Sequence, residues 1–300
     1  GPSSESVRRV LQRRLFVKPS GYAPVHRTVA EYLAARHLTK RINGGGLLPT
    51  RLASLMLATP LHLVSNLRGL AGWLAALCEP MQSAIFNADP AAVLNYGDLH
   101  LLSTTTKEAL IRCLGTHPSV RYEGHLWQRA VSHVPLVQKD MQSFVKVWLA
   151  ELLHTEEPAT AKVFTAHVLL GALAHAPQDS GWELTLLHLL RNERSSDDIR
   201  DSALHALLRH KTSPETLIGL LEEIALEKLP DERGRLRDCL LETLYPVHVR
   251  PSQVVRYLSP TRSRRRSIPS FGMFWTYQIQ KQTPTAQLGE LMEALTAAQD

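Results

Sequence analysis

The sequence contains few of the residues on which disulfides, metal centres and reactive thiols depend. Its 300 residues include three cysteines, Cys78, Cys113 and Cys239, which lie far apart in apolar, helix-like surroundings. The chain has no CxxC pair and no cysteine–histidine cluster with the spacing of a tetrahedral metal site. We therefore expect three reduced, mostly buried thiols and no metal centre.

The common catalytic motifs are also missing. The phosphate-binding loop GxxxxGK[ST] is absent, and the glycines at 44–46 are followed by Leu-Leu-Pro, so they are interpreted as a link between helices. There is no GxSxG elbow, HxxxH or HExxH among the fourteen histidines, which we expect at the surface or in packing between repeats. The sequence thus predicts a chain that is not an enzyme and holds no cofactor.

Long apolar runs and targeting segments are lacking as well. No window approaches eighteen uninterrupted apolar residues, so a membrane span is not expected. Gly1-Pro2 resembles the scar left by a tag-cleaving protease, and no charged-then-apolar signal segment follows it. We therefore expect a cytoplasmic chain.

The net charge of +6 is unevenly distributed. Residues 1–60 contain ten Lys/Arg and two Glu, residues 61–255 contain 18 basic and 23 acidic residues, and residues 256–300 contain six basic and three acidic residues. Both ends are therefore basic. Such asymmetry is typical of a surface for nucleic acid or an acidic partner, or of a face that docks on another part of a larger protein.

Helical periodicity dominates the chain from residue 46 onward. Short turns rich in Pro, Gly, Asn, Asp and Ser separate the apolar repeats, and β-type alternation is nearly absent. The sequence therefore predicts an all-α fold. The expected helices are Leu47–Ala58, Leu67–Leu77, Thr106–Leu114, Met141–Leu153, Ala159–Ala174, Glu183–Leu190, Ile199–Leu208, Pro214–Leu226 and Leu236–Leu244.

The later helices come in pairs. The pair Gly181–Asn192 and Asp197–His210 contains IRDSALHALLRH, which resembles the second helix of a HEAT-type repeat, and residues 214–228 and 232–245 form a similar pair. A single pair cannot bury its apolar stripe, so neighbouring pairs must stack. The predicted architecture is a HEAT-like α-solenoid of helical hairpins.

A different arrangement is expected at the start. Residues 6–15 read as a basic helix, and residues 16–25 as a short hairpin with a Pro-Ser-Gly tip. The helix VHRTVAEYLAARHL follows at 25–38. This order is typical of the end of a winged-helix domain, so a short winged-helix remnant is predicted at the N-terminus.

The motif at 25–38 resembles the segment that closes the winged-helix part of NACHT-type STAND NTPases. The match rests on a histidine, four residues, and then Glu-aromatic-Leu-Ala-Ala, that is His26, Glu31, Tyr32, Leu33, Ala34 and Ala35. Segments of large bacterial members are similar to LVSNLRGLAGWLAAL (63–77), NADPAAVLNYGD (87–98), LRDCLLETLYP (236–246), VVRYLSP (254–260) and FGMFW (271–275).

The resemblance implies three parts: the end of a winged-helix domain with a linker (1–45), a helical linker domain (46–118) and HEAT-like repeats (119–300). It gives His26 a contact with the β-phosphate of ADP held by an NTPase core outside this chain, to which ATP/ADP and Mg would belong. Glu31 and Tyr32 would be structural, fixing their helix against the wing. Without the resemblance, His26 would instead cap its helix or bond the wing backbone.

The function implied by the resemblance is a non-catalytic sensor and autoinhibitory scaffold of a bacterial anti-phage signalling protein. Its solenoid surface would recognise a protein ligand, another macromolecule, or the missing NTPase domain. The alternative is a HEAT-like solenoid that binds nucleic acid directly through its basic ends. A helical-repeat enzyme acting on damaged DNA bases is the least favoured, because aromatic residues do not recur along the repeats.

An arginine tract forms the most concentrated positive charge. Arg262, Arg264, Arg265 and Arg266 lie between two prolines and are expected in a loop. The loop would contact nucleic acid, an acidic partner or the missing NTPase, or would simply be solvated. The aromatic residues that follow, Phe271, Phe274 and Trp275, have the spacing of core positions on a helix.

Overall fold

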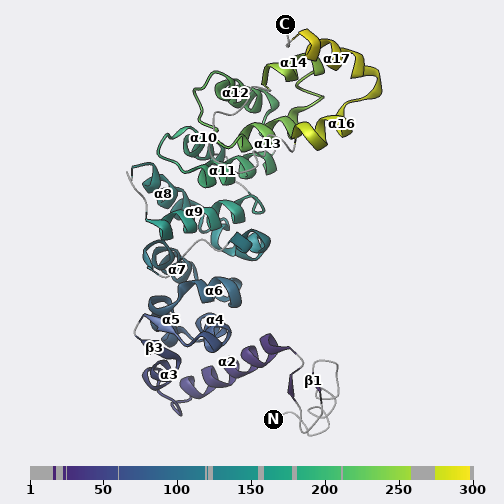
Figure 1. Cartoon of the computed structure of the whole chain (residues 1–300). Helices are drawn as coiled ribbons and strands as arrows, with labels where there is room; N and C mark the ends of the chain where they lie inside the picture. The colour runs from purple at the N-terminus through teal and green to yellow at the C-terminus, as the bar shows by residue number, and fades with distance from the viewer. Residues whose placement is uncertain are drawn as a thin grey trace. The chain divides into compact units, whose positions relative to one another are not determined.

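The protein is described by a computed structural model, which is predominantly helical and so confirms the expected all-α class (Figure 1). The structure describes residues 16–17, 23–24, 26–59, 61–118, 120, 124–154, 159–177, 181–210, 212–257 and 274–297. In these ranges no helix combines the length and the apolar character that crossing a membrane would require.

The chain divides into two compact units. The first comprises Gly1–His125 with Ala159–Thr165, and the second comprises Leu126–Pro158 with Ala166–Asp300. The predicted three-part division at residues 45 and 118 stays a prediction.

The first unit is organised around helix α4. Small residues make this possible: a Cβ on Gly72 would lie 2.7 Å from the backbone oxygen of Ala92, so α4 and α6 approach backbone to backbone. Helices α2, α5 and α6 all pack on α4. The elements are β1 (Phe16–Val17), β2 (Ala23–Pro24), α2 (Arg27–Asn43), α3 (Pro49–Met56), β3 (Leu57–Thr59), β4 (His62–Leu63), η1 (Ser65–Leu67), α4 (Arg68–Leu77), α5 (Glu79–Ala88), α6 (Pro90–Tyr96), η2 (Leu99–Leu101) and α7 (Thr104–Thr116).

Two short hairpins interrupt the helices of this unit. Strands β1 and β2 pair antiparallel where the sequence predicted a hairpin, although the winged-helix assignment stays a prediction. The predicted helix Leu47–Ala58 is wrong at its end: α3 stops at Met56, and Leu57 pairs with Leu63 across β3 and β4. The proline at position 60 disfavours helical geometry at Thr59, so the helix could not have continued past that point.

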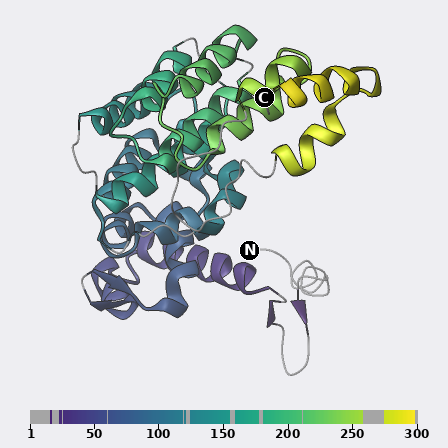
Figure 2. The same ribbon diagram turned by 45° about the horizontal axis from the view of Figure 1, so that its top comes forward.

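The second unit consists of helices that pack in succession. Helix α10 packs on α11 and α12 on α13, as the sequence predicted; α13 also contacts α11, and α14 packs on α17 (yellow-green and yellow in Figure 2). The elements, some of which begin in the first unit, are η3 (Gly124–Val137), α8 (Gln142–Leu153), α9 (Thr160–Leu173), α10 (Trp182–Arg191), α11 (Asp197–Arg209), α12 (Pro214–Ala225), α13 (Arg235–Leu244), α14 (Pro251–Val254), η4 (Val255–Tyr257), η5 (Phe274–Gln278), α16 (Ile279–Gln282), η6 (Thr285–Gln287) and α17 (Leu288–Ala297).

Helix starts and core positions mostly follow the sequence. Ser213 caps α12 by accepting a hydrogen bond from the backbone N–H of Thr216 at 3.2 Å. Phe274 is fully buried as expected, whereas Trp275 is 37% exposed, so its assignment to the core was wrong. The spacing predicted one shared face, but Phe274 lies in a π-helical turn with a different rotation per residue. Phe271 lies outside the described residues.

The three cysteines are free thiols, as predicted. Cys78 is buried, while Cys113 and Cys239 are half-buried.

Candidate functional site

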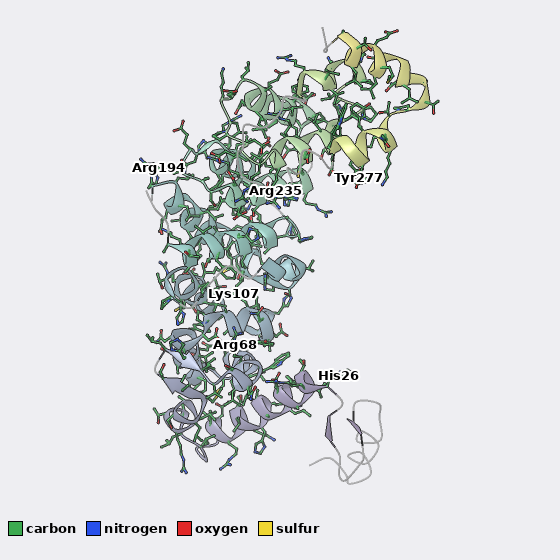
Figure 3. All side chains as sticks on the ribbon, in the orientation of Figure 1. His26, Arg68, Lys107, Arg194, Arg235 and Tyr277 are labelled. Atoms are coloured by element: carbon green, nitrogen blue, oxygen red, sulfur yellow. The ribbon has the colours of Figure 1, made fainter. Side chains whose placement is uncertain are left out.

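Helix α2 carries the residues that the sequence singled out first. His26 directly precedes the helix, and its backbone oxygen accepts a hydrogen bond from the N–H of Val29 at 3.0 Å. Its side chain is exposed and makes no capping hydrogen bond, so the capping role considered for it does not apply (Figure 3). The nucleotide contact stays a prediction.

Glu31 lies where α2 meets α4. It accepts a hydrogen bond from Arg27 Nε at 2.7 Å, and Arg27 Nη2 also donates to the backbone oxygen of Asn66 at 2.5 Å. A Cβ on Gly69 would lie 2.1 Å from Glu31 Oε2. The glutamate therefore fills space on α4 that only a glycine leaves open.

Tyr32 makes the neighbouring contact. Its ring packs edge-to-face on Trp73 of α4, with 5.0 Å between the centroids. The sequence predicted that Glu31 and Tyr32 fix α2 against the wing. In the described residues both side chains contact α4, and the contact with the wing stays a prediction.

The segments at 63–77 and 87–98, both part of the family resemblance, meet in this unit. Arg68 Nε lies 2.6 Å from Asp89 Oδ2, and the other carboxylate oxygen of Asp89 caps α6 by accepting from the N–H of Ala92 at 3.0 Å. One aspartate thus positions two elements at once. The sequence did not predict this pair, because its members lie 21 residues apart.

The outer side of α2 is basic. Arg36, His37, Lys40 and Arg41 are all exposed, and we call these four residues the α2 strip. The opposite side of the helix is buried through Ala35 and Ile42. The helix therefore uses its apolar side for packing and presents positive charge on the other.

A network of ion pairs joins α11 to the start of α13 in the second unit. Arg233 Nε lies 3.2 Å from Asp197 Oδ2, and its Nη1 lies 3.2 Å from Asp198 Oδ1. Arg235 Nη1 lies 2.7 Å from Asp201 Oδ2. These ion pairs stabilise the contact between successive helices.

An Arg-Asp dipeptide recurs in the two helices, as Arg200-Asp201 and Arg237-Asp238, at equivalent places in the repeated pattern. Arg200 Nη2 donates to two backbone oxygens of the loop before α11, both at 3.1 Å. Arg237 Nη1 donates to the backbone oxygen of Tyr257 at 3.1 Å. Both arginines are buried and tie their helices to a neighbouring turn.

The two aspartates of this pattern are buried acids. Burial raises the pKa of Asp201 to about 6, against the lowering effect of Arg235. Burial, followed by repulsion from Glu242 and Asp231, raises the pKa of Asp238 to about 7. Among the described residues the backbone N–H of Phe274 is the group that favours the ionised form by hydrogen bonding, and it lowers the pKa less than burial raises it. Burial therefore favours the protonated form of Asp238 at pH values where an ordinary aspartate is ionised.

A buried serine–histidine pair was not predicted from the sequence. Ser202 Oγ lies 2.7 Å from His167 Nδ1, and the serine hydroxyl donates to the backbone oxygen of Asp198 at 2.7 Å. If the serine hydroxyl donates to Asp198, Nδ1 carries its own proton and donates to Oγ. In this arrangement the imidazole cannot act as a base toward Ser202, and the pair serves to pack α9 on α11.

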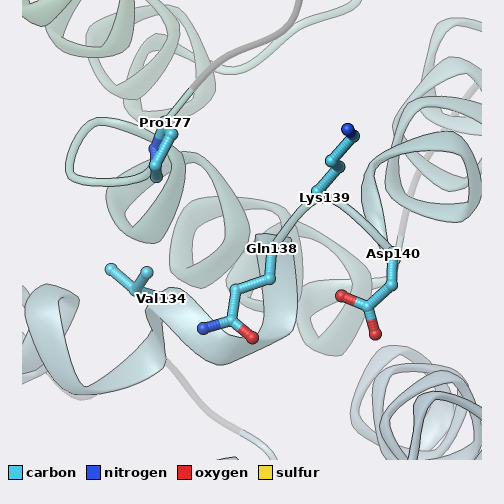
Figure 4. Close-up of a pocket in the computed structure, with 5 residues that line it drawn as sticks. All are labelled: Val134, Gln138, Lys139, Asp140 and Pro177. Atoms are coloured by element: carbon cyan, nitrogen blue, oxygen red, sulfur yellow. The ribbon is translucent and has the colours of Figure 1, made fainter.

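One cavity of about 740 Å³ opens in the second unit (Figure 4). Gln142 holds its edge in place: its side-chain amide donates to the backbone oxygen of Pro177 and accepts from Trp182 Nε1, both at 2.9 Å. The residues that line it are the apolar Val134 and Pro177 and the polar Gln138, Lys139 and Asp140. Within the described residues no group of His, Cys, Asp or Glu has the arrangement of a metal site.

The arginine tract, Arg262, Arg264, Arg265 and Arg266, lies outside the described residues. Comparison of the chain with protein-family models, curated proteins and solved structures gives no match. The functional interpretation therefore rests on the residues and on the geometry of α2, α11 and α13.

Proposed function

We propose that this chain is a non-catalytic, ligand-sensing and autoinhibitory region of a NACHT-type STAND NTPase that acts in bacterial anti-phage defence. Its helical hairpins would form a HEAT-like solenoid in the cytoplasm and recognise a macromolecular ligand. The recurring Arg200-Asp201 and Arg237-Asp238 pairs carry this proposal. The dipeptide recurs in successive helical hairpins, and each time its arginine is buried and donates to a backbone oxygen of a neighbouring turn, as expected of stacked repeats that present an extended surface.

The docking of α2 supports the family part of the proposal. Glu31 and Tyr32 hold α2 on α4, which leaves the His26 side chain exposed at the helix N-terminus. An imidazole can donate to a phosphate oxygen, and the N-terminal end of a helix favours an anion. ATP or ADP and Mg would be bound by the NTPase core, with His26 as this chain's contribution.

The test uses the full-length protein that contains this chain. The His26→Ala variant is expected to release ADP that the unmodified protein retains through purification. His37→Ala is the matched control, because it removes another exposed histidine of α2 that lies outside the motif. Nucleotide content is measured by chromatography after denaturation. Equal ADP content in the two variants, or no nucleotide in the unmodified protein, would contradict the proposal.

A second candidate function is direct binding of nucleic acid through the basic ends of the chain. The observation that favours it is the α2 strip, where exposed cations gather on a helix whose one acidic residue, Glu31, is turned toward α4. Such binding would weaken steeply with salt.

A further inference from the structure

The segment around α2 has an unusual shortage of acidic residues. Between residues 32 and 78 the sequence contains Arg36, Lys40, Arg41, Arg51 and Arg68, but no Asp or Glu. Of these cations, Arg68 is paired with a carboxylate from outside the segment. The positive charge of α2 is therefore not neutralised by its neighbours in the sequence.

Folding makes little use of the α2 strip. The side chains of Arg36, His37 and Lys40 form no hydrogen bond or ion pair with any residue that the structure describes, and Arg41 donates only to the backbone oxygen of Gly46, at 3.1 Å. Lys40 and Arg41 lie in the last turn, where they compensate the helix dipole. Arg36 lies one turn earlier, and its like charge at i,i+4 from Lys40 destabilises the helix slightly.

Four exposed arginines of the second unit behave differently. Arg191 lies 2.7 Å from a carboxylate oxygen of Glu223, and Arg256 lies 2.6 Å from one of Glu222. Arg233 and Arg235 belong to the network between α11 and α13 described above. In that unit these cations stabilise contacts between helices, whereas the α2 strip has no such partner.

We infer that the α2 strip binds the phosphate backbone of double-stranded nucleic acid without reading its sequence. This inference rests on the second candidate function. Residues 36–41 rise about 8 Å along the helix axis, a length over which duplex DNA presents about four phosphate charges. The strip contains no Asn or Gln to read adenine, and contacts of its arginine and lysine side chains with phosphates carry no sequence information.

The same geometry argues against a lipid surface. A helix that lies on a membrane inserts a bulky apolar side between the headgroups. The apolar side of α2 is occupied by α4, and on the exposed side the large apolar residue is Leu33, which is 39% exposed. The exposed side of α2 therefore offers mainly positive charge, which favours a water-soluble polyanion over a lipid surface.

The test is a fluorescence-anisotropy titration of a mixed-sequence DNA duplex with the 300-residue chain between about 50 and 200 mM salt. We compare the unmodified chain with Arg36→Ala/Lys40→Ala. Each lost phosphate contact lowers the slope of log affinity against log salt by about 0.9. The double variant should therefore lose about two slope units, and its affinity should fall about tenfold less across this salt range.

Two controls separate the inference from the proposed function. Arg209→Ala/Lys228→Ala removes the same charge from exposed positions of the second unit and should leave the slope unchanged. Arg264→Ala/Arg265→Ala/Arg266→Ala tests the arginine tract. If the tract variant loses the slope while Arg36→Ala/Lys40→Ala keeps it, the α2 assignment is overturned but nucleic-acid binding stands. Equal losses in the two double variants would also overturn it, and no binding by the unmodified chain would overturn both.

Discussion

Asp238 makes the stability of the second unit depend on pH in a direction opposite to that of a salt-bridged acid. Its side chain is 5% exposed and lies on α13. Burial is the main reason that its pKa rises to about 7. We predict that Asp238→Asn stabilises the unit above neutral pH.

The size of the expected stabilisation follows from the pKa shift of Asp238. The pKa moves from 3.8 to about 7, and one unit corresponds to about 1.4 kcal/mol, so the ionised carboxylate costs up to about 4 kcal/mol above pH 7. The folded state holds the proton of Asp238 more tightly than the unfolded state does. The contribution of this carboxyl to the free energy of unfolding is therefore most favourable below pH 4 and falls as pH rises toward 7. Asparagine has no charge to bury, so the variant should lose this part of the pH dependence.

Amide hydrogen exchange in α13 measures the free energy of opening of the second unit separately from that of the first. The free energy of opening is compared at about pH 5 and about pH 8, after correction for intrinsic exchange rates. The gain from Asp238→Asn should be larger at the higher pH. Glu293→Gln, which neutralises an exposed acid on α17, should change neither value. If Asp238→Asn is no more stable than the unmodified chain at the higher pH, the reasoning is refuted.

Three further predictions concern single side chains. Gly72→Ala should destabilise the first unit by about 1–3 kcal/mol in urea unfolding, because the new Cβ would lie 2.7 Å from the backbone oxygen of Ala92, and unchanged stability would contradict the close approach of α4 and α6. Ser202→Ala should cost the second unit about 1–3 kcal/mol, because it leaves His167 Nδ1 buried without its partner; hydrogen exchange in α11 measures this, and no loss would show that the bond is dispensable. Burial raises the pKa of Cys239 to about 12, so its alkylation at neutral pH, followed by mass spectrometry, should be far slower than that of a cysteine peptide. Equal rates would contradict its burial.

The helices were largely predictable from the sequence. Periodicity placed a helix at Ile199–Leu208, which is observed as Asp197–Arg209, and one at Pro214–Leu226, which is observed as Pro214–Ala225. The second start was the more accurate, because a serine cap and a proline in the first turn mark it locally. Where the signal was weaker, as in the short β3–β4 hairpin, the helical pattern was extended too far.

Contacts between distant residues were beyond the reach of the sequence. The hydrogen bond between Ser202 and His167 joins residues 35 positions apart, and the space above Gly69 that Glu31 fills is a property of two packed helices. Apolar spacing also did not distinguish Phe274 from its exposed neighbour Trp275. For the α2 strip the signal was present as the basic N-terminal end, but only the structure separates cations that stabilise the fold from those that do not.

The most direct test of this account is the affinity of Arg36→Glu for a DNA duplex at low salt, with its thermal stability measured on the same sample. The substitution places a carboxylate four residues before Lys40, an arrangement that stabilises a helix by a few tenths of a kcal/mol. We predict weaker binding at unchanged or slightly higher stability. Unchanged affinity, or a loss of affinity that follows a loss of stability, would contradict the claim that this charge serves a ligand and not the fold.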